Sequence, residues 1–120
     1  MTEIQNSKQC DLEERTLKFA KEVIKFVKSL PRTIANTEIM KQLIRASGSV
    51  GANYIEANEA LSKKDFILRI KICRKEAKES RYWLRLTEIN EEDAEKQKQI
   101  LIQEATELMK IFGAILEKTK

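Results

Sequence analysis

A row of cationic side chains is the feature of this sequence best suited to chemistry. Between Lys63 and Arg85 the chain has nine basic and three acidic residues, whereas its overall net charge is only +4. Five of these cations recur at intervals of three or four residues, which places them on one side of a helix. This basic row consists of Lys71, Arg74, Lys78, Arg81 and Arg85. Guanidinium and ammonium groups at this spacing form a surface that binds anions, above all phosphates.

The basic row largely lacks the acidic neighbours that surface helices usually interleave with lysine, because only Glu88 lies near it, at its end. The residues three and four positions from Arg74, Lys78 and Arg81 are apolar, aromatic or basic. Glu76 and Glu79 fall on another side of the helix. Like charges one turn apart repel, so an anion close by would stabilise the row. The sequence leaves several readings open: a solvated face, carboxylates of the chain's own first or last helix, a neighbouring subunit, or a nucleic-acid backbone.

The sequence argues against catalysis and metal binding. It contains no histidine, the commonest general base and metal ligand. Glu56 and Glu59 are interpreted as a solvated pair, and Cys10 and Cys73 do not form a CxxC motif. Segment 48–53 is rich in small residues, but it lacks the Gly-Lys-Ser/Thr ending of a phosphate-binding loop. We therefore expect no enzyme activity, no catalytic residue, no metal and no cofactor.

The helix that carries the basic row also has two apolar faces. One stripe fits a buried core and consists of Phe66, Ile70, Cys73, Ala77 and Leu84. The other face consists of Leu68, Ile72, Trp83 and Leu86. A helix in a small monomeric bundle needs only one apolar stripe, and aromatic residues are enriched in subunit contacts. We therefore predict that the second face is an oligomer interface, the alternative being a second core in a thicker bundle.

Composition and apolar periodicity predict the elements that position these residues. The chain has 120 residues, 35% of them charged, with three glycines and one proline, which is typical of long helices. We expect one domain over residues 1–120, with residues 1–10 flexible. Helices are predicted over Leu12–Ser29, Thr37–Leu61, Ser62 to about Asn90, and Glu92–Lys118. The short connections predict an all-α, antiparallel up-down-up-down four-helix bundle.

Capping signals mark the starts of these helices. Asp11 with Glu14 and Ser62 with Asp65 have the spacing of capping boxes, and Asn36 or Thr33 is expected to cap the second helix. No apolar run is long enough to span a bilayer, and no apolar secretory signal is visible. We therefore expect a cytoplasmic protein without a membrane partner.

Each helix is expected to bury one stripe. The predicted core residues outside the third helix are Phe19, Val23, Phe26, Val27, Leu30, Ile39, Leu43, Ala46, Val50, Ala57, Leu61, Leu101, Leu108, Ile111, Phe112 and Ile115. The stripe of the second helix keeps one phase across Gly48 and Gly51. We therefore expect that helix to be continuous there, with small residues that let a neighbouring helix approach closely.

The segment Arg45–Ala57 resembles the signature of the four-helix-bundle proteins encoded in intervening sequences of 23S rRNA genes. That signature reads like Arg-x-Ser-x-Ser-x-x-Ala-Asn-Ile-Ala-Glu-Gly, and this chain departs from it at Tyr54, Ile55 and Ala57. The matching residues are Arg45, Ser47, Ser49, Ala52, Asn53 and Glu56. Segments 62–66 and 76–84, and the Leu30-Pro31 break, are also similar to the family.

The resemblance implies a four-helix bundle that assembles into a ring-like homopentamer. It also implies kinship with the accessory variability proteins of diversity-generating retroelements, which bind a reverse transcriptase and nucleic acid through basic surfaces. The partners that it implies are RNA or DNA and a reverse-transcriptase-like or ribosome-associated protein.

Together these observations predict an oligomeric, non-enzymatic bundle that contacts RNA phosphates through the basic row. Phosphate contacts position a protein without reading bases, so little sequence preference is expected. The alternative is a protein–protein interaction scaffold that docks an acidic partner through the same row.

Overall fold

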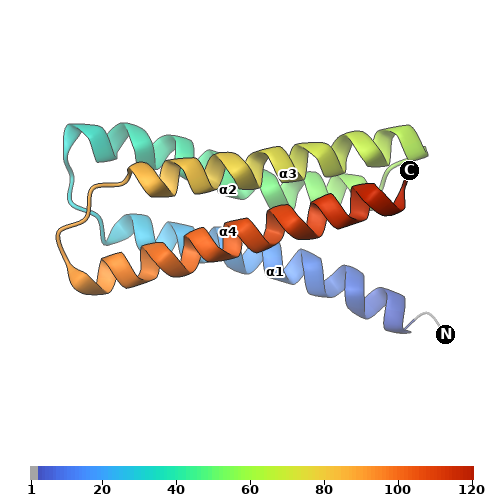
Figure 1. The fold of residues 1–120 in the computed structure, drawn as a ribbon, viewed down its shortest axis with the longest axis horizontal. Helices are drawn as coiled ribbons and strands as arrows, with labels where there is room; N and C mark the ends of the chain where they lie inside the picture. The colour runs from blue at the N-terminus through green and yellow to red at the C-terminus, as the bar shows by residue number, and fades with distance from the viewer. Residues whose placement is uncertain (1–2) are drawn as a thin grey trace.

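The computed structural model describes residues 3–120 and the side chains of residues 11–120, and this part of the chain has four helices and no strand (Figure 1). The helices are α1 (Glu3–Lys28), α2 (Ile34–Asn58), α3 (Lys63–Leu86) and α4 (Glu92–Lys118). The α1–α2 and α3–α4 connections lie at one end of the bundle and the α2–α3 turn at the other (Figure 1). The all-α fold class is confirmed.

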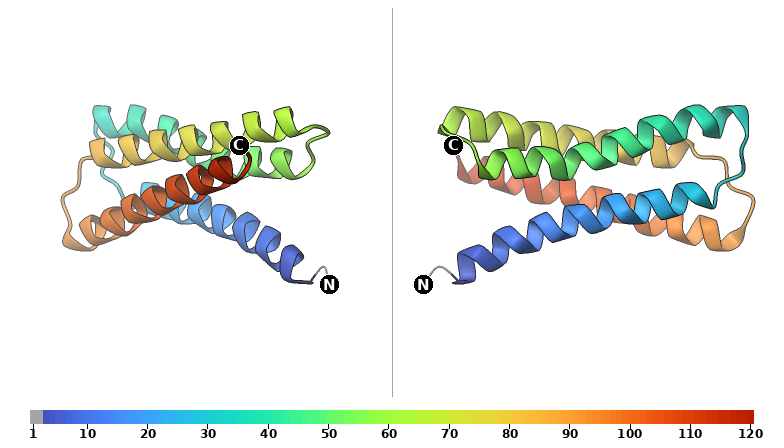
Figure 2. Two further views of the ribbon diagram at one scale, coloured as in Figure 1. Left: turned by 45° about the vertical axis from the view of Figure 1, so that its right-hand side comes forward. Right: turned by 180° about the vertical axis from the view of Figure 1, so that it is seen from behind.

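Helix α3 has the most extensive contacts in the bundle, with α2 on one side and α4 on the other. Helix α1 packs on α2 and, less extensively, on α4. Its N-terminal half diverges from the other three helices (Figures 1 and 2). The helix that carries the basic row is therefore held between two neighbours, and this fixes which of its sides reaches solvent.

The helix starts follow side-chain capping in two of the predicted cases. Thr33 caps α2, where its Oγ1 accepts a hydrogen bond from the Asn36 amide at 3.0 Å. Ser62 caps α3 in the same way, accepting from the Asp65 amide at 3.0 Å. The Ser62 prediction is confirmed, and of the two candidates for α2 the structure selects Thr33 over Asn36.

The predicted boundaries of three helices are wrong. Helix α1 begins at Glu3, so the predicted capping box of Asp11 and Glu14 lies inside the helix. Helix α2 begins at Ile34 and ends at Asn58, short of Leu61. Helix α3 ends at Leu86, short of Asn90. Apolar periodicity marks only the packed part of a helix, and the polar first turns of α1 carry no such signal.

The core follows the predicted stripes with local exchanges. All five predicted residues of α1 are buried. Leu61 lies beyond the end of α2 and is fully exposed, and Ile39 on α2 is only half-buried. Met40 and Tyr54 occupy buried positions of α2 instead. The predicted α4 residues Ile111 and Ile115 are half-buried, and the fully packed positions there are Leu101, Ala105, Leu108, Phe112 and Leu116.

Helix α2 is unbroken through both of its glycines, as predicted, but they differ in their surroundings. A Cβ at Gly51 would lie 3.0 Å from the Oγ1 of Thr16 on α1. A Cβ at Gly48 would meet nothing within 4 Å. The predicted close approach of a neighbouring helix is therefore confirmed at Gly51. At Gly48 the prediction is wrong, because no described residue of another helix lies close to it.

A buried amide joins the two connections at one end of the bundle. Asn36 is completely buried, and its Nδ2 donates to the carbonyl oxygens of Pro31 and Glu88, each at 3.0 Å. Its Oδ1 accepts a hydrogen bond from the Glu88 amide at 2.8 Å. A buried backbone group without a partner costs about 1–3 kcal/mol. Asn36 therefore anchors the α3–α4 connection to the start of α2.

We expect Asn36→Ala to lower the free energy of unfolding by about 2–4 kcal/mol, because three backbone groups lose their partner together. Urea unfolding followed by circular dichroism measures this loss. Thr37→Ala is the matched control, since the Thr37 hydroxyl is exposed and bonds only the Thr33 carbonyl of its own helix turn. Equal midpoints for the two variants would contradict the anchoring role of Asn36.

We expect Gly48→Ala to stabilise the protein by up to about 1 kcal/mol, since alanine is the better helix former and the site is open. Gly51→Ala gains the same propensity but pushes against Thr16, so its melting temperature should be lower than that of Gly48→Ala. Gly51→Leu should be the least stable of the three, because overpacking costs about 1–3 kcal/mol. Indistinguishable melting curves for the three variants would contradict the close α1–α2 approach.

Candidate nucleic-acid interface

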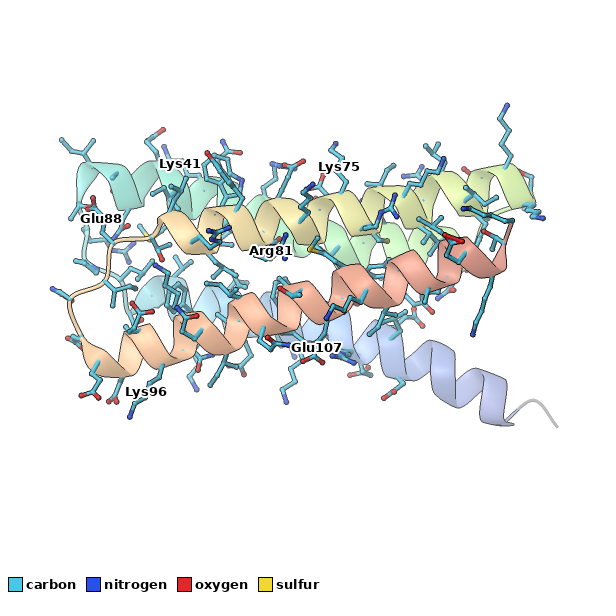
Figure 3. All side chains as sticks on the ribbon, in the orientation of Figure 1. Lys41, Lys75, Arg81, Glu88, Lys96 and Glu107 are labelled. Atoms are coloured by element: carbon cyan, nitrogen blue, oxygen red, sulfur yellow. The ribbon has the colours of Figure 1, made fainter. Side chains whose placement is uncertain are left out.

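The basic row lies on the side of α3 that faces solvent and α4. Helix α3 buries Ile70, Cys73 and Leu84 completely, which turns the opposite side of the helix outward. Four members of the row are exposed, and Arg81 is half-buried. The Arg81 Nη1 donates to the Oγ1 of Thr106 on α4 at 3.3 Å, and Figure 3 shows Arg81 between these two helices. The structure thus brings all five predicted cations onto one surface.

None of the carboxylates among residues 11–120 lies within 4.0 Å of a cation of the basic row. Cations elsewhere in the same part of the chain do form ion pairs, namely Arg15, Lys41, Arg45, Lys75 and Lys120. Within the described side chains, pairing of the row with the chain's own first or last helix is therefore absent. The row keeps its charge available for a solvent ion or for another molecule.

Two acidic residues of α3, Glu76 and Glu79, face α2 instead. Arg45 of α2 places its Nη1 3.6 Å from Glu76 Oε1 and its Nη2 3.3 Å from Glu79 Oε1. Glu76 is buried, and Glu79 also lies 3.9 Å from the Nζ of Lys75. The prediction that these two glutamates lie away from the basic row is confirmed.

A second ion-pair cluster joins α1 to α4. Arg15 donates from Nε to Glu104 Oε2 at 2.7 Å and from Nη2 to Glu104 Oε1 at 2.8 Å, a two-pronged pair. The same Nη2 donates to Glu107 at 2.8 Å. Hydrogen bonds from Gln103 and then Arg15 lower the pKa of Glu107, and the pair with Glu104 raises the pKa of Arg15. Figure 3 shows Glu107 on the α1 side of α4, away from Arg81.

An open groove of about 780 Å³ runs between α1 and α4 beside this cluster. Phe19, Ile100 and Leu101 contribute its apolar wall, and Arg15 and Glu104 contribute its charged one. Arg15, Glu104 and Glu107 pair with one another there, whereas Lys18 and Glu22, which also line the groove, form no ion pair among residues 11–120. The groove thus has one unpaired cation and no row of cations comparable with the basic row.

The one cysteine whose side chain the structure describes is a core residue. Cys73 is buried, its Sγ donates to the Val50 carbonyl at 3.4 Å, and burial raises its pKa to about 12. It is therefore a protonated core thiol at neutral pH. Within residues 11–120 no three His, Cys, Asp or Glu side chains gather as a metal site would require. None of the described helices combines the length and the apolar character needed to cross a membrane.

The second apolar face of α3 is not uniform. Leu68 and Leu86 are 53% and 44% exposed, whereas Ile72 and Trp83 are half-buried and Trp83 packs against the core. Trp83 also has a buried Nε1 without a hydrogen-bond partner among the described residues. The predicted interface residues thus divide into two exposed leucines and two side chains that the bundle itself already covers in part.

The sequence reasoning missed a row of exposed apolar residues on the neighbouring helices α1 and α2. Leu17 and Ile24 on α1 and Ile44 and Ile55 on α2 are each between 42% and 51% exposed. On α2, positions 44, 48, 51 and 55 share one face, and Gly51 in that face touches Thr16, next to Leu17. We call Leu17, Ile24, Ile44 and Ile55 the α1–α2 apolar row. The helical spacing of these four residues in the sequence could have revealed it.

The sequence reasoning also missed an aromatic residue beside the basic row. Tyr82 is 57% exposed, and it lies four residues after Lys78 and three before Arg85. This spacing puts the three side chains next to one another on the outer surface of α3. Spacing alone could have identified Tyr82, whereas its exposure required the structure.

Residues 8–114 match the sequence model of a family described as 23S rRNA-intervening sequence protein. The chain belongs to this family. It is also similar to the crystal structure of a protein with unknown function from the S23 ribosomal protein family of Bacteroides thetaiotaomicron. The two chains are 31% identical, the match covers 92% of this chain and 98% of the other, and the TM-score is 0.76. None of the curated proteins compared with the chain matches it.

In this 23S rRNA-intervening sequence protein, the residues that carried the resemblance have structural partners. Arg45 pairs with Glu76 and Glu79 of α3. Asn53 accepts a hydrogen bond from Arg69 of α3 at 3.0 Å and donates to the Ser49 carbonyl at 2.9 Å. These members of the signature segment join α2 to α3, so in this chain they position the helix that carries the basic row.

Proposed function

We propose that this up-down-up-down bundle is an oligomeric, non-enzymatic protein that binds RNA through contacts between phosphates and the basic row. The observation that carries the proposal is the row itself: five cations on one side of α3 without a carboxylate within 4.0 Å among residues 11–120. Unpaired cations along a rigid helix attract a polyanion, and the release of its counterions drives binding. Phosphate contacts of this kind carry little base preference.

The family context favours RNA over DNA as the polyanion. The family's name associates it with 23S rRNA, and the similar solved structure is assigned to a ribosomal protein family. We accordingly propose a cytoplasmic role with a ribosome-associated or reverse-transcriptase-like partner. Kinship with the accessory proteins of diversity-generating retroelements belongs to the same proposal.

The second candidate function is a scaffold that docks an acidic protein through the same surface. The exposed side chains of Tyr82 and Leu86 beside the cations favour it, because protein interfaces combine aromatic residues with arginine. The two functions differ in one simple respect: only the first requires binding to RNA of arbitrary sequence at low salt.

We expect labelled RNAs of unrelated sequence to bind with similar affinity, and log K to fall linearly with log salt. Arg74→Glu with Arg85→Glu should weaken binding at least tenfold and make the salt slope shallower by about 1.4–1.8, because two phosphate contacts are lost. Both residues are exposed and make no ion pair among residues 11–120, so thermal stability should change little. Fluorescence anisotropy at several salt concentrations measures both quantities.

Lys21→Glu with Lys25→Glu is the matched control, since it makes the same change in net charge at exposed positions on α1. Equal weakening by the control would mean that net charge, not the basic row, determines binding. Absence of RNA binding at the lowest salt would overturn the RNA proposal and leave the scaffold as the better account.

We further propose that the protein is a homo-oligomer, with a pentamer as the expected form. Exposed apolar side chains support assembly because they lie on two surfaces of the bundle: Leu68 and Leu86 on α3, and the α1–α2 apolar row. Exposed apolar patches on a small domain commonly mark contact surfaces. Leu68 and Leu86 are the two exposed residues among the four that the sequence predicts for the interface.

Light scattering should give a mass about five times the 13.9 kDa of one chain. We expect Leu68→Glu with Leu86→Glu to reduce this mass while the helical content stays unchanged, because neither leucine is buried in the bundle. Ile44→Glu with Ile55→Glu tests the α1–α2 apolar row in the same way. A monomeric wild-type protein at micromolar concentration would contradict the proposed assembly.

A further inference from the structure

Tyr82 gives the basic row a feature that phosphate binding alone does not need. Its side chain is 57% exposed, in the part of α3 where the core-facing residues are completely buried. Lys78 and Arg85 lie one turn before and one turn after it, on the same outer surface. An aromatic ring is thus flanked on both sides by cations that have no carboxylate partner among residues 11–120.

The Tyr82 ring is held in place by its neighbour. The rings of Tyr82 and Trp83 make an edge-to-face contact, with centroids 5.1 Å apart and an interplanar angle of 74°. Trp83 in turn is half-buried and packs against the hydrophobic core. A ring that is already ordered loses less conformational entropy when a ligand stacks on it. Tyr82 is therefore an exposed and preorganised aromatic surface.

We propose that this surface recognises single-stranded RNA, with an unpaired base stacking on Tyr82 while the flanking phosphates lie along the basic row. This inference rests on the proposed RNA binding and specifies its substrate class. The faces of bases in a duplex are covered by their stacked neighbours, so an aromatic side chain on a helix surface reaches them only in single strands. Aromatic platforms beside a cationic track are typical of proteins that bind single strands without sequence preference.

The geometry of α3 also favours a single strand. The basic row follows one helix, and successive turns of that helix are about 5.4 Å apart, so its cations form a narrow linear track. An A-form duplex offers a deep, narrow major groove that side chains do not read and a wide, shallow minor groove. A flexible single strand can follow the narrow track and still turn one base toward Tyr82.

The test compares a labelled single-stranded RNA with the same strand annealed to its complement, at one salt concentration. We expect the wild-type protein to prefer the single strand. Tyr82→Ala should weaken single-strand binding by about 5- to 150-fold, the equivalent of losing one stacked base. It should leave duplex affinity and the salt slope unchanged, because the cations remain. Tyr82→Phe keeps the ring and should retain the preference.

A direct readout uses a single strand that contains 2-aminopurine, whose fluorescence is quenched when the base stacks. Quenching is expected with the wild-type protein and Tyr82→Phe, and not with Tyr82→Ala at saturating concentration. Ile34→Ala, which removes a 90% exposed apolar side chain at the start of α2, outside the basic row and outside the surfaces proposed for assembly, is the control and should quench like the wild type.

The outcomes separate this inference from the proposal that it rests on. Equal affinity for single strand and duplex, together with normal binding by Tyr82→Ala, would overturn the stacking role and leave phosphate binding standing. Absence of binding to either RNA at low salt would overturn the RNA proposal itself. A third explanation is that Tyr82 contacts a neighbouring subunit. Light scattering tests it, because a lower mass of Tyr82→Ala than of the wild type would identify Tyr82 as a subunit contact and overturn the inference.

Discussion

The burial of one face of α3 between α2 and α4 is the constraint on which the rest of this structure depends. Ile70, Cys73, Ala77, Ser80 and Leu84 on that face are all completely buried. Because the helix repeats every 3.6 residues, fixing this face also fixes the direction of every other α3 side chain. The basic row faces solvent as a direct consequence, and Glu76 and Glu79 are directed toward α2. The surface we propose to bind RNA is thus a product of core packing.

Polar contacts across helices make this arrangement specific. A buried glutamate such as Glu76 is tolerated only near an opposite charge, because an isolated buried carboxylate is costly. Arg45 supplies that charge from α2, at 3.6 Å, and so links α2 to α3. Asn36 does the same for the two connections at one end of the bundle through hydrogen bonds to Pro31 and Glu88.

The same contacts separate the charges of the molecule. Arg45 pairs with Glu76 and Glu79 of α3, and Arg15 pairs with Glu104 and Glu107 on the far side of α4. These four carboxylates are therefore already paired, and none of them lies within 4.0 Å of a cation of the basic row. A row of cations without a paired carboxylate creates a local positive field that attracts polyanions from a distance and orients them on arrival. Trp83, by ordering Tyr82, adds the proposed stacking surface within that field.

The sequence by itself determined the helices, most core stripes, the cap at Ser62 and the common side of the five cations, because these follow from the helical period and from contacts within one turn. It also predicted the family through Arg45–Ala57. Only the tertiary structure decided which glycine contacts α1, that Asn36 joins two connections, and that Tyr82 is exposed while Trp83 is half-buried. Such features depend on the register and rotation of one helix against another, which no local spacing encodes. The packing of the helices likewise decided that no carboxylate among residues 11–120 lies within 4.0 Å of the basic row.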